Sequence, residues 1–261
     1  MIAGGVKRTP DPERVGGLAW TRRTNGGLTG AERRRLILAI VAGQWDYVLG
    51  RAKLVLGRVP DRAAAIDVAA FSPPDTALAS EAEVACAEQP VSIVGHSYRT
   101  WLFGKALAAL DRVELDAEQF YCASLLHDFG IAEVVSGQDF TVRSADCALA
   151  CVRRAGAEVS VGEAIADAIC VHPTPGISVE HDGAVGCYVQ AGAMVDVGLR
   201  LDDIAPDNRE AVLARYPRGA GFKGAFAAMI RNEAHAVPGG RFALLTRMGF
   251  PLLVRVAPFH D

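Results

Sequence analysis

The stretch YCASLLHDFG, residues 121–130, decides the fold prediction for this chain. An apolar segment leads to two adjacent polar side chains, His127 and Asp128, and then to Gly130. An imidazole and a carboxylate side by side in a protein interior are costly unless each is hydrogen-bonded or bound to a metal. The stretch therefore predicts a buried helix that ends in a hydrogen-bonded or metal-binding pair.

The residues around this pair predict the limits of the helix. Asp116 is followed three residues later by Gln119, a spacing typical of a capping box, and Gly130 is typical of the residue that stops a helix. We therefore expect a helix over residues 116–129, with the pair in its last turn. There the helix dipole presents partial negative charge towards a bound cation.

The composition of the whole chain agrees with a helical fold. About half of the 261 residues are hydrophobic, alanine is frequent and aromatic residues make up only 7%, which favours packed helices over a β-sandwich. Apolar residues recur at helical spacing, for example over about 142–156, 160–172 and 183–200, and no useful length of sequence alternates as a strand does. We predict an all-α protein.

Differences in composition along the chain predict four parts. Residues 1–27 are rich in Gly, Pro and Arg and are expected to be a disordered leader. The other parts are an N-terminal helical extension (28–80), a main helical domain that carries the site (81–205) and a C-terminal helical extension packed on that domain (206–261). The apolar end of the last part is expected to pack across the bundle or to form a subunit contact. The alternative for it is an amphipathic segment at a membrane surface.

The sequence also bears on the compartment. No run of about 18 uncharged apolar residues predicts a membrane-spanning helix, and the N-terminus lacks the apolar segment of a secretory signal. The six cysteines include no CxxC pair, and four of them lie in apolar helical patterns, which favours free thiols in a reducing cytoplasm. We predict a cytoplasmic protein with no membrane partner.

The net charge of −3 is unevenly distributed. Residues 1–62 carry 12 Lys and Arg against 5 Asp and Glu, and such a basic arm would attract an anion, nucleic acid or an acidic surface. No aromatic residues interleave with the basic ones to stack on bases. We therefore expect a leader and one Arg-rich helix face here, and no nucleic-acid partner.

Five candidate metal ligands lie among apolar or small residues on four expected helices. They are His96, His127, Asp128, His172 and Asp196. Bundles build metal sites from imidazole and carboxylate ligands on several facing helices, and small residues before Asp196 would let a helix backbone approach a cofactor. Each residue also has a structural interpretation. A single buried histidine is more often a hydrogen-bonded core residue, and Asp196 would pair with Arg99 or Arg143.

The order His96, His127–Asp128, Asp196 resembles that of the HD-domain superfamily of metal-dependent phosphohydrolases. Four segments are most similar to its cyanamide-hydratase-like branch. These are HSYRTWLFG at 96–104, SLLHDFG at 124–130, VH at 171–172 and YVQAGAMVD at 188–196. The resemblance covers about residues 85–205 and implies an HD-domain helical bundle. It also implies that one divalent transition metal ion, such as Zn, Fe or Mn, is bound by His96, His127, Asp128 and Asp196.

The resemblance further implies catalytic roles for Asp128, His172 and Arg99. His172 stands where some members place an additional histidine for a second metal or for substrate, and His181 is a weaker candidate for the same role. Arg99 lies one helical turn after His96 and would face the same cavity, or it would instead orient Asp128 or Asp196.

Three functions follow as hypotheses, each with a small-molecule substrate or a binding partner. The first is hydrolysis of a phosphate ester or nucleotide by metal-activated water, with Arg99 or Lys105 offsetting phosphoryl charge. The second is hydration of a small nitrile-type compound, with Asp128 or His172 moving protons. The third is a non-catalytic binding module on the same scaffold. The oligomeric state stays open, a homo-oligomer included.

Overall fold

The computed structural model describes residues 14–260, and within them the chain forms α-helices and short 3-10 helices without a β-strand. The predicted all-α fold is confirmed. The main bundle consists of α3 (Ala77–Ala87), α4 (Val91–Asp111), α5 (Ala117–Leu126), α6 (Phe140–Ala155), α7 (Val159–Val171) and α9 (Ala184–Val195). The expected limits of the helices in this part agree with these bounds to within a few residues.

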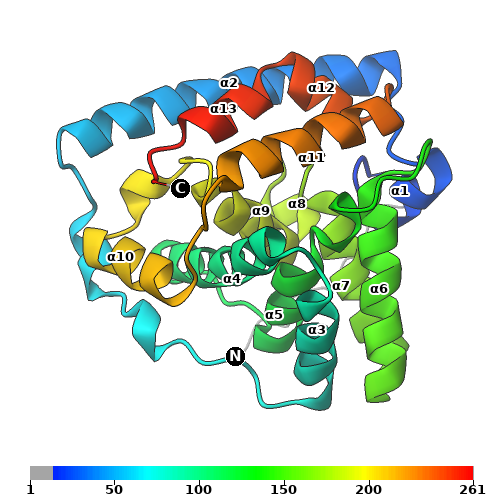
Figure 1. The fold of residues 1–261 in the computed structure, drawn as a ribbon, viewed down its shortest axis with the longest axis horizontal. Coiled ribbons are helices and arrows are strands. Elements are labelled where there is room, and N and C mark those ends of the chain that lie inside the picture. The colour runs from blue at the N-terminus through cyan, green and yellow to red at the C-terminus, as the bar shows by residue number, and fades with distance from the viewer. Residues whose placement is uncertain (1–13, 261) are drawn as a thin grey trace, which may run out of the picture.

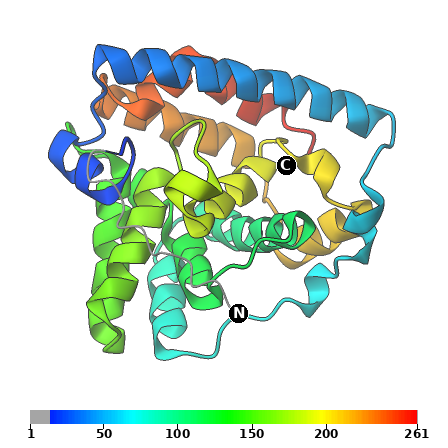
Figure 2. The same cartoon turned by 180° about the vertical axis from the view of Figure 1, so that it is seen from behind.

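The remaining helices lie around this bundle (Figure 1). They are α1 (Leu18–Thr24), α2 (Gly30–Val55), α8 (Val179–Asp182), α10 (Pro206–Arg215), α11 (Phe222–Ala236), α12 (Arg241–Arg247) and α13 (Phe250–Val256). Figures 1 and 2 show α2 along one side of the molecule, with α11, α12 and α13 between it and the bundle. The N- and C-terminal extensions therefore meet on the same side.

Helices α4 and α9 pack closely because glycines remove side chains from their contact. A Cβ atom on Gly192 would overlap the carbonyl oxygen of Thr100, and one on Gly104 would overlap the carbonyl oxygen of Tyr188. Gly192 thus serves contact between two helices, where we had expected the small residues of α9 to admit a cofactor. This approach brings Asp196, at the end of α9, next to α4.

The start of the described chain differs from the expected disordered leader. Residues 14–27 include helix α1, in which Trp20 is buried. The guanidinium of Arg241 lies over the Trp20 ring, and Trp20 Nε1 donates a hydrogen bond to Glu32 Oε1 at 2.9 Å. Burial of one large aromatic side chain contributes about 1.5–3 kcal/mol or more to folding. This free energy offsets the tendency of a Gly-rich segment to remain disordered. The first 13 residues lie outside the described part.

The central helix begins as expected but ends differently. The Asp116 side chain accepts the Gln119 N–H at 2.9 Å, while α5 ends at Leu126. Gly130 lies in a following 3-10 turn and is not among the glycines with positive φ. A Cβ atom there would overlap the carbonyl oxygen of Phe140. Gly130 therefore permits close packing against α6, and its predicted role as the left-handed stop of the helix is wrong.

All six cysteines lie in the described part of the chain and are free. Cys122, Cys151 and Cys170 are buried as predicted from their apolar helical patterns, whereas Cys147, the fourth in such a pattern, is partly exposed and Cys86 is buried instead. No helix among residues 14–260 is long and apolar enough to span a bilayer.

Candidate metal centre

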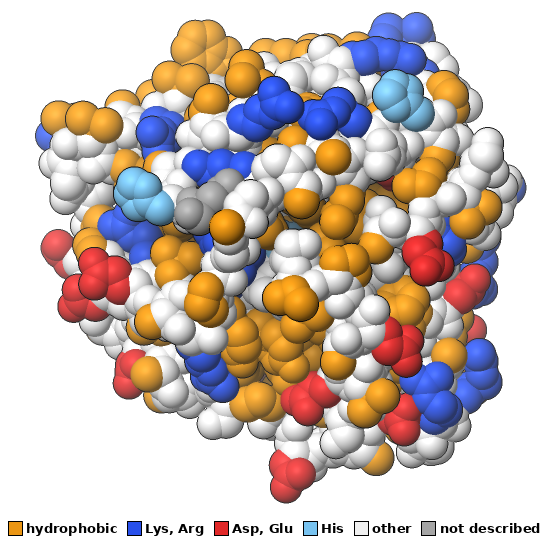
Figure 3. Space-filling view, viewed as in Figure 1, with side chains coloured by type: hydrophobic (Ala, Val, Ile, Leu, Met, Phe, Trp, Pro, Cys, Tyr) orange, Lys and Arg blue, Asp and Glu red, His pale blue; other side chains and the backbone are white. Residues whose placement is uncertain are grey.

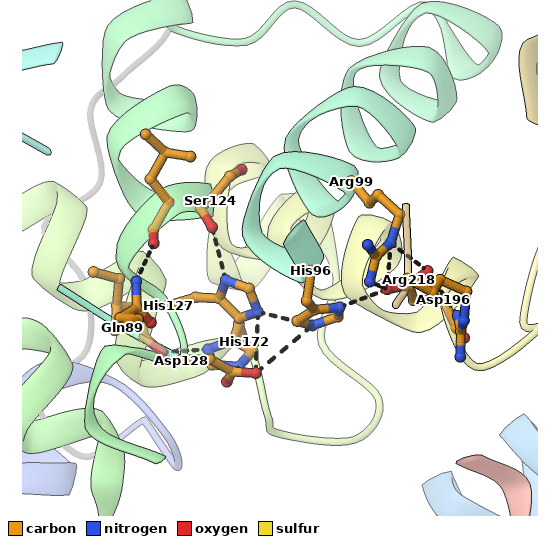
Figure 4. Close-up of polar contacts among 11 residues, drawn as sticks. Gln89, His96, Arg99, Ser124, His127, Asp128, His172, Asp196 and Arg218 are labelled. Atoms are coloured by element: carbon orange, nitrogen blue, oxygen red, sulfur yellow. Dashed lines mark hydrogen bonds and ion pairs between the residues drawn. The ribbon is translucent and has the colours of Figure 1, made fainter. Parts of the chain in front are cut away.

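Three histidine rings are fixed by hydrogen bonds at Nδ1 (Figure 4). His127 caps the end of α5, and its Nδ1 lies 2.8 Å from the carbonyl oxygen of Ser124. His172 caps α7 in the same way, with Nδ1 2.6 Å from the carbonyl oxygen of Ile169. A carbonyl oxygen only accepts, so Nδ1 carries a proton in both rings, and in the neutral form of each ring Nε2 keeps its lone pair.

The third ring, His96 on α4, is held by a carboxylate instead. Its Nδ1 lies 2.8 Å from Asp196 Oδ2. Burial would raise the pKa of Asp196, but Arg99, His96 and Arg218 hold it far below its usual range. The carboxylate is therefore ionised and accepts the His96 Nδ1 proton. Such a contact to the far nitrogen of a histidine is the usual second support of a metal ligand.

The free ring nitrogens converge on one carboxylate. His96 Nε2 and His127 Nε2 lie 3.3 Å apart, and each approaches Asp128 Oδ2, at 3.6 and 3.4 Å. Ligand atoms about 2.1 Å from a tetrahedral zinc ion are about 3.4 Å from one another. The three buried side chains thus have the spacing of ligands around one ion, and a His96, His127 and Asp128 group could hold a metal.

The electrostatics of this group favour one positive charge between the rings. Two neutral imidazoles that point lone pairs at each other over 3.3 Å repel unless a proton or a metal cation lies between them. Burial lowers the pKa of His96 despite Asp196. Burial would also lower the pKa of His127, but Asp128, the Ser124 carbonyl and Asp196 together raise it. Burial would raise the pKa of Asp128 itself, but the adjacent His127 keeps it well below its usual range.

His172 lies on the other side of the same carboxylate. Its Nε2 is 3.6 Å from Asp128 Oδ1, and its ring meets that of His127 edge-on, with centroids 4.9 Å apart. Burial lowers the pKa of His172, so the ring is neutral at pH 7 with its lone pair on Nε2. The structure thus brings His172 together with His96, His127 and Asp128 and places an available base beside the ligand group.

Asp196 does not belong to the same group of ligand atoms. Its two oxygens accept hydrogen bonds from Arg99 Nη2 at 2.7 Å, Arg218 Nη1 at 2.9 Å and His96 Nδ1 at 2.8 Å. It lies behind the His96 ring, on the side away from Asp128 (Figure 4). The geometry therefore gives Asp196 the role of orienting His96, in place of the direct ligation implied by the resemblance.

Arg99 also lies behind the site. Its side chain is fully buried, and besides Asp196 it donates to the carbonyl oxygens of Tyr216 and Pro217 at 3.1 and 3.2 Å. Arg99 does not line the cavity described below. Its position therefore does not support the expected catalytic role, which needs direct contact with a substrate. Of the two roles considered for Arg99, orientation of Asp196 fits. Arg218 donates to the same carboxylate, and it was not predicted because it lies outside the region of resemblance.

The other weaker candidates lie elsewhere. Lys105 Nζ lies over the rings of Phe71 and Trp101, at a separate cavity. Arg143 donates to the carbonyl oxygens of Gln138 and Gly130. His181 is exposed on α8, where its Nδ1 contacts the hydroxyl of Ser178.

A cavity of about 180 Å³ opens over the ligand group, and its walls are mostly apolar. Polar side chains enter its lining only from the three histidines, Asp128, Gln44 and Gln190, and no Lys or Arg of the described chain does. Phe226, Phe242 and Phe250 supply aromatic walls from the C-terminal helices. Helix α2 contributes Ile40 and Gly43, so both extensions roof a site that the main bundle builds.

The amide side chain of Gln190 positions the segment after His172. Its Nε2 donates to the carbonyl oxygens of His172 and Thr174, at 2.5 and 2.8 Å. Gln44 on α2 also lines the cavity, and its Nε2 donates to the carbonyl oxygen of Met248 at 2.7 Å. Neither glutamine was predicted, because an amide in a helical pattern gives no signal until its neighbours in space are known.

Searches of protein-family models and of curated proteins found no match to this chain.

Proposed function

We propose that this chain is a metal-dependent enzyme of the HD type that adds water to a small neutral substrate of the nitrile class. The observation that carries the proposal is the arrangement of three histidines. Each is tied at Nδ1 to an oxygen, and each presents Nε2 within 3.6 Å of one carboxylate, Asp128. A histidine buried only for packing needs no such convergence.

The ligand group would consist of His96, His127 and Asp128, with Asp196 as the support of His96. A divalent transition metal bound there would lower the pKa of a water molecule towards neutrality and polarise the substrate. Three protein ligands are typical of catalytic sites, which keep a further position open. The donor set of two imidazoles and a carboxylate suits Zn, Fe or Mn.

The chain's own residues supply the proton transfers. His172 is neutral, is held in one tautomer by Ile169 and presents Nε2 beside Asp128 Oδ1 at 3.6 Å. It would accept a proton from the attacking water and return it to the substrate nitrogen as the C–O bond forms. Addition of water across a C≡N bond in this way gives an imidic acid, which tautomerises to the amide as its hydroxyl proton moves to the nitrogen, and every proton taken up by His172 is returned.

The cavity favours the nitrile interpretation over the phosphate interpretation. A phosphate ester carries one or two negative charges that enzymes offset with Arg, Lys or several metal ions. Arg99 and Arg218 are occupied by Asp196, and Lys105 lies at a different cavity. A volume of about 180 Å³ with apolar walls suits a molecule close in size to benzene, which fills a cavity of about 150 Å³.

A substrate panel tests the proposal. Protein loaded with Zn, Mn or Fe is incubated with cyanamide, small aliphatic and aromatic nitriles, p-nitrophenyl phosphate and nucleotides, and products are followed by mass spectrometry. We expect an amide or urea product from the neutral compounds, and a fall of about 10²–10⁴-fold in kcat for His172→Ala with its metal retained. Phosphate release without any hydration would contradict the proposal, and His181→Ala serves as the matched control.

A further inference from the structure

Helix α2 is apolar on two opposite faces. Its inner face packs on the protein through Leu36, Ile40 and Tyr47, which are buried. Its outer face carries seven large hydrophobic side chains with exposed fractions from 39% to 84%. These are Leu38, Val41, Trp45, Val48, Leu49, Val55 and Leu56, which we call the α2 outer stripe. A helix that is hydrophobic all round is normally buried all round.

The outer stripe has the spacing of a coiled-coil seam. Leu38, Val41, Trp45, Val48, Ala52 and Val55 follow one another at alternating intervals of three and four residues. That is the a and d pattern of a heptad repeat, which matches a second helix lying almost parallel or antiparallel to the first. Figure 3 shows hydrophobic side chains protruding along the upper edge of the molecule, where α2 runs in Figure 1.

The area of the stripe is sufficient for a stable contact. With roughly 100 Å² of apolar surface on a fully exposed aliphatic side chain and about 200 Å² on Trp, it exposes on the order of 500 Å². A standard interface buries about 800 Å² per partner, of which about 60% is apolar. The stripe therefore supplies the apolar share of such an interface from one helix.

From these observations we propose that the α2 outer stripe binds the same stripe of a second copy of this chain, with the two helices antiparallel. A two-fold axis makes one patch serve both partners. Both ends of α2 are basic, with Arg34 and Arg35 exposed at its start and Lys53 and Arg58 exposed at and just after its end. The antiparallel orientation sets Arg34 and Arg35 near the partner's helix end, where free carbonyl groups carry partial negative charge that offsets part of the repulsion. A parallel pair would set the four arginines of the two helix starts side by side without these carbonyl groups.

The middle of the helix favours a second copy over a lipid surface, because the basic side chains lie only towards its two ends, at residues 33–35 and 51–58. Between residues 36 and 50 the only charged side chain is Asp46, an exposed acid next to Trp45. Helices that lie on anionic membranes carry Lys and Arg along their polar face. Here the face opposite the stripe is apolar and packs on the chain itself.

This contact reaches the site through the same helix. Ala39, Ile40, Gly43 and Gln44 on the inner face of α2 line the cavity over the ligand group. A partner on the outer face would hold this part of the cavity wall in place. The proposed dimer goes beyond the proposed chemistry, and it does not depend on which substrate the cavity binds.

Sedimentation equilibrium of the full chain tests the proposal. We expect the wild-type protein to be a dimer at micromolar concentration and Trp45→Glu to have half its mass with an unchanged helical circular dichroism spectrum. Val84→Glu, which alters an exposed hydrophobic residue on α3, is the matched control and stays dimeric. A wild-type monomer, or a dimer unaffected by Trp45→Glu, would overturn the proposal.

Two further measurements separate the alternatives. Trp20 and Trp101 are buried, so a red shift of tryptophan emission on dilution reports exposure of Trp45 as the dimer dissociates. Leu38→Cys and Val55→Cys, at the two ends of the seam, should form a disulfide when mixed, and neither should alone, with oxidised wild type as background. A Leu38→Cys homodimer overturns the antiparallel arrangement, and flotation of a wild-type monomer with anionic vesicles assigns the stripe to lipid instead.

Discussion

At the scale of single residues, the hydrogen bond donated by Nδ1 indicates whether a buried histidine is oriented to bind a metal through Nε2 or only packs in the core. His127 and His172 give that hydrogen to a carbonyl oxygen three residues earlier in their own helices, and His96 gives it to Asp196. The helix ends therefore do more than present partial charge. They fix two imidazoles in the tautomer that leaves Nε2 free for a cation.

The role assigned to Asp196 leads to a prediction. In Asp196→Asn the His96 Nδ1 contact loses its charge, and Arg99 and Arg218 lose their anion. We expect the affinity for a divalent transition metal to fall about 10–100-fold, and the free energy of unfolding to fall by about 3–5 kcal/mol because buried charges lose their partner. Competition with a chelator and urea denaturation measure the two effects.

A second buried carboxylate provides the control for this prediction. Asp202 is paired with Lys53 at 3.2 Å and lies away from the ligand group. Asp202→Asn should therefore leave the metal affinity unchanged. If Asp196→Asn instead bound no metal at all while remaining folded, Asp196 would be a direct ligand, as the resemblance implies.

Most of the candidate site could be predicted at this scale. His96, His127, Asp128 and His172 stood out as polar side chains in apolar helical patterns, and the structure places all four together. The position of Asp196 behind His96 could not be predicted, because a sequence pattern does not say which of two carboxylates faces the ring nitrogens. Arg218 was missed because an arginine in a Gly-rich loop gives no signal.

At the scale of helices, the contact between α4 and α9 sets the distance between Asp196 and His96. Gly192→Val would place a branched side chain against the Thr100 carbonyl, and the helices would have to separate. We expect a loss of about 1–3 kcal/mol in the free energy of unfolding together with weaker metal binding, measured by urea denaturation and metal titration.

The matched glycine lies in helix α11. A Cβ atom on Gly224 meets no atom within 4 Å, so Gly224→Ala should leave metal binding unchanged and raise stability by about 0.5–1 kcal/mol. Normal metal affinity in Gly192→Val would mean that the close approach of these two helices does not hold the site.

Helices α6 and α11 meet at a buried acid that predicts a pH dependence. Burial raises the pKa of Glu233 from 4.5 to about 7, aided by Asp139 and opposed by the Phe140 N–H and Arg143. The folded pKa exceeds the unfolded one, so the contribution of Glu233 to stability is complete below about pH 4.5 and is lost as the pH rises through about 7.

Glu233→Gln removes this titration. We expect the variant to gain about 1–3 kcal/mol in the free energy of unfolding relative to wild type between pH 5 and pH 8. Urea denaturation at the two pH values measures it. A constant difference between variant and wild type across this range would show that Glu233 does not titrate there.

The helices also show which sequence patterns predicted the fold correctly and which did not. Helical periodicity predicted the bundle helices well, because burial on one face repeats over many residues. Single-residue signals failed. Gly130 looked like a helix stop but is needed for contact with Phe140, and a Gly-rich start hid helix α1, which one buried Trp20 anchors.

At the scale of the whole molecule, the cavity depends on both extensions. The main bundle supplies the ligand group, while α2 and α11–α13 close the space over it with apolar side chains. Its lining comes from segments more than 200 residues apart, so its character could not be predicted from the sequence. Among residues 14–260, no Lys or Arg lines the cavity, and this is why we propose a neutral substrate in place of a phosphate.

The central claim is that His96, His127 and Asp128 bind a metal ion, and metal analysis of the purified protein tests it most directly. We predict about one equivalent of a divalent transition metal in wild-type protein prepared without chelator. His127→Ala should lose it while keeping its helical circular dichroism spectrum, and His181→Ala should retain it. Wild-type protein that is free of metal and takes none up on titration with Zn, Mn or Fe would contradict the account.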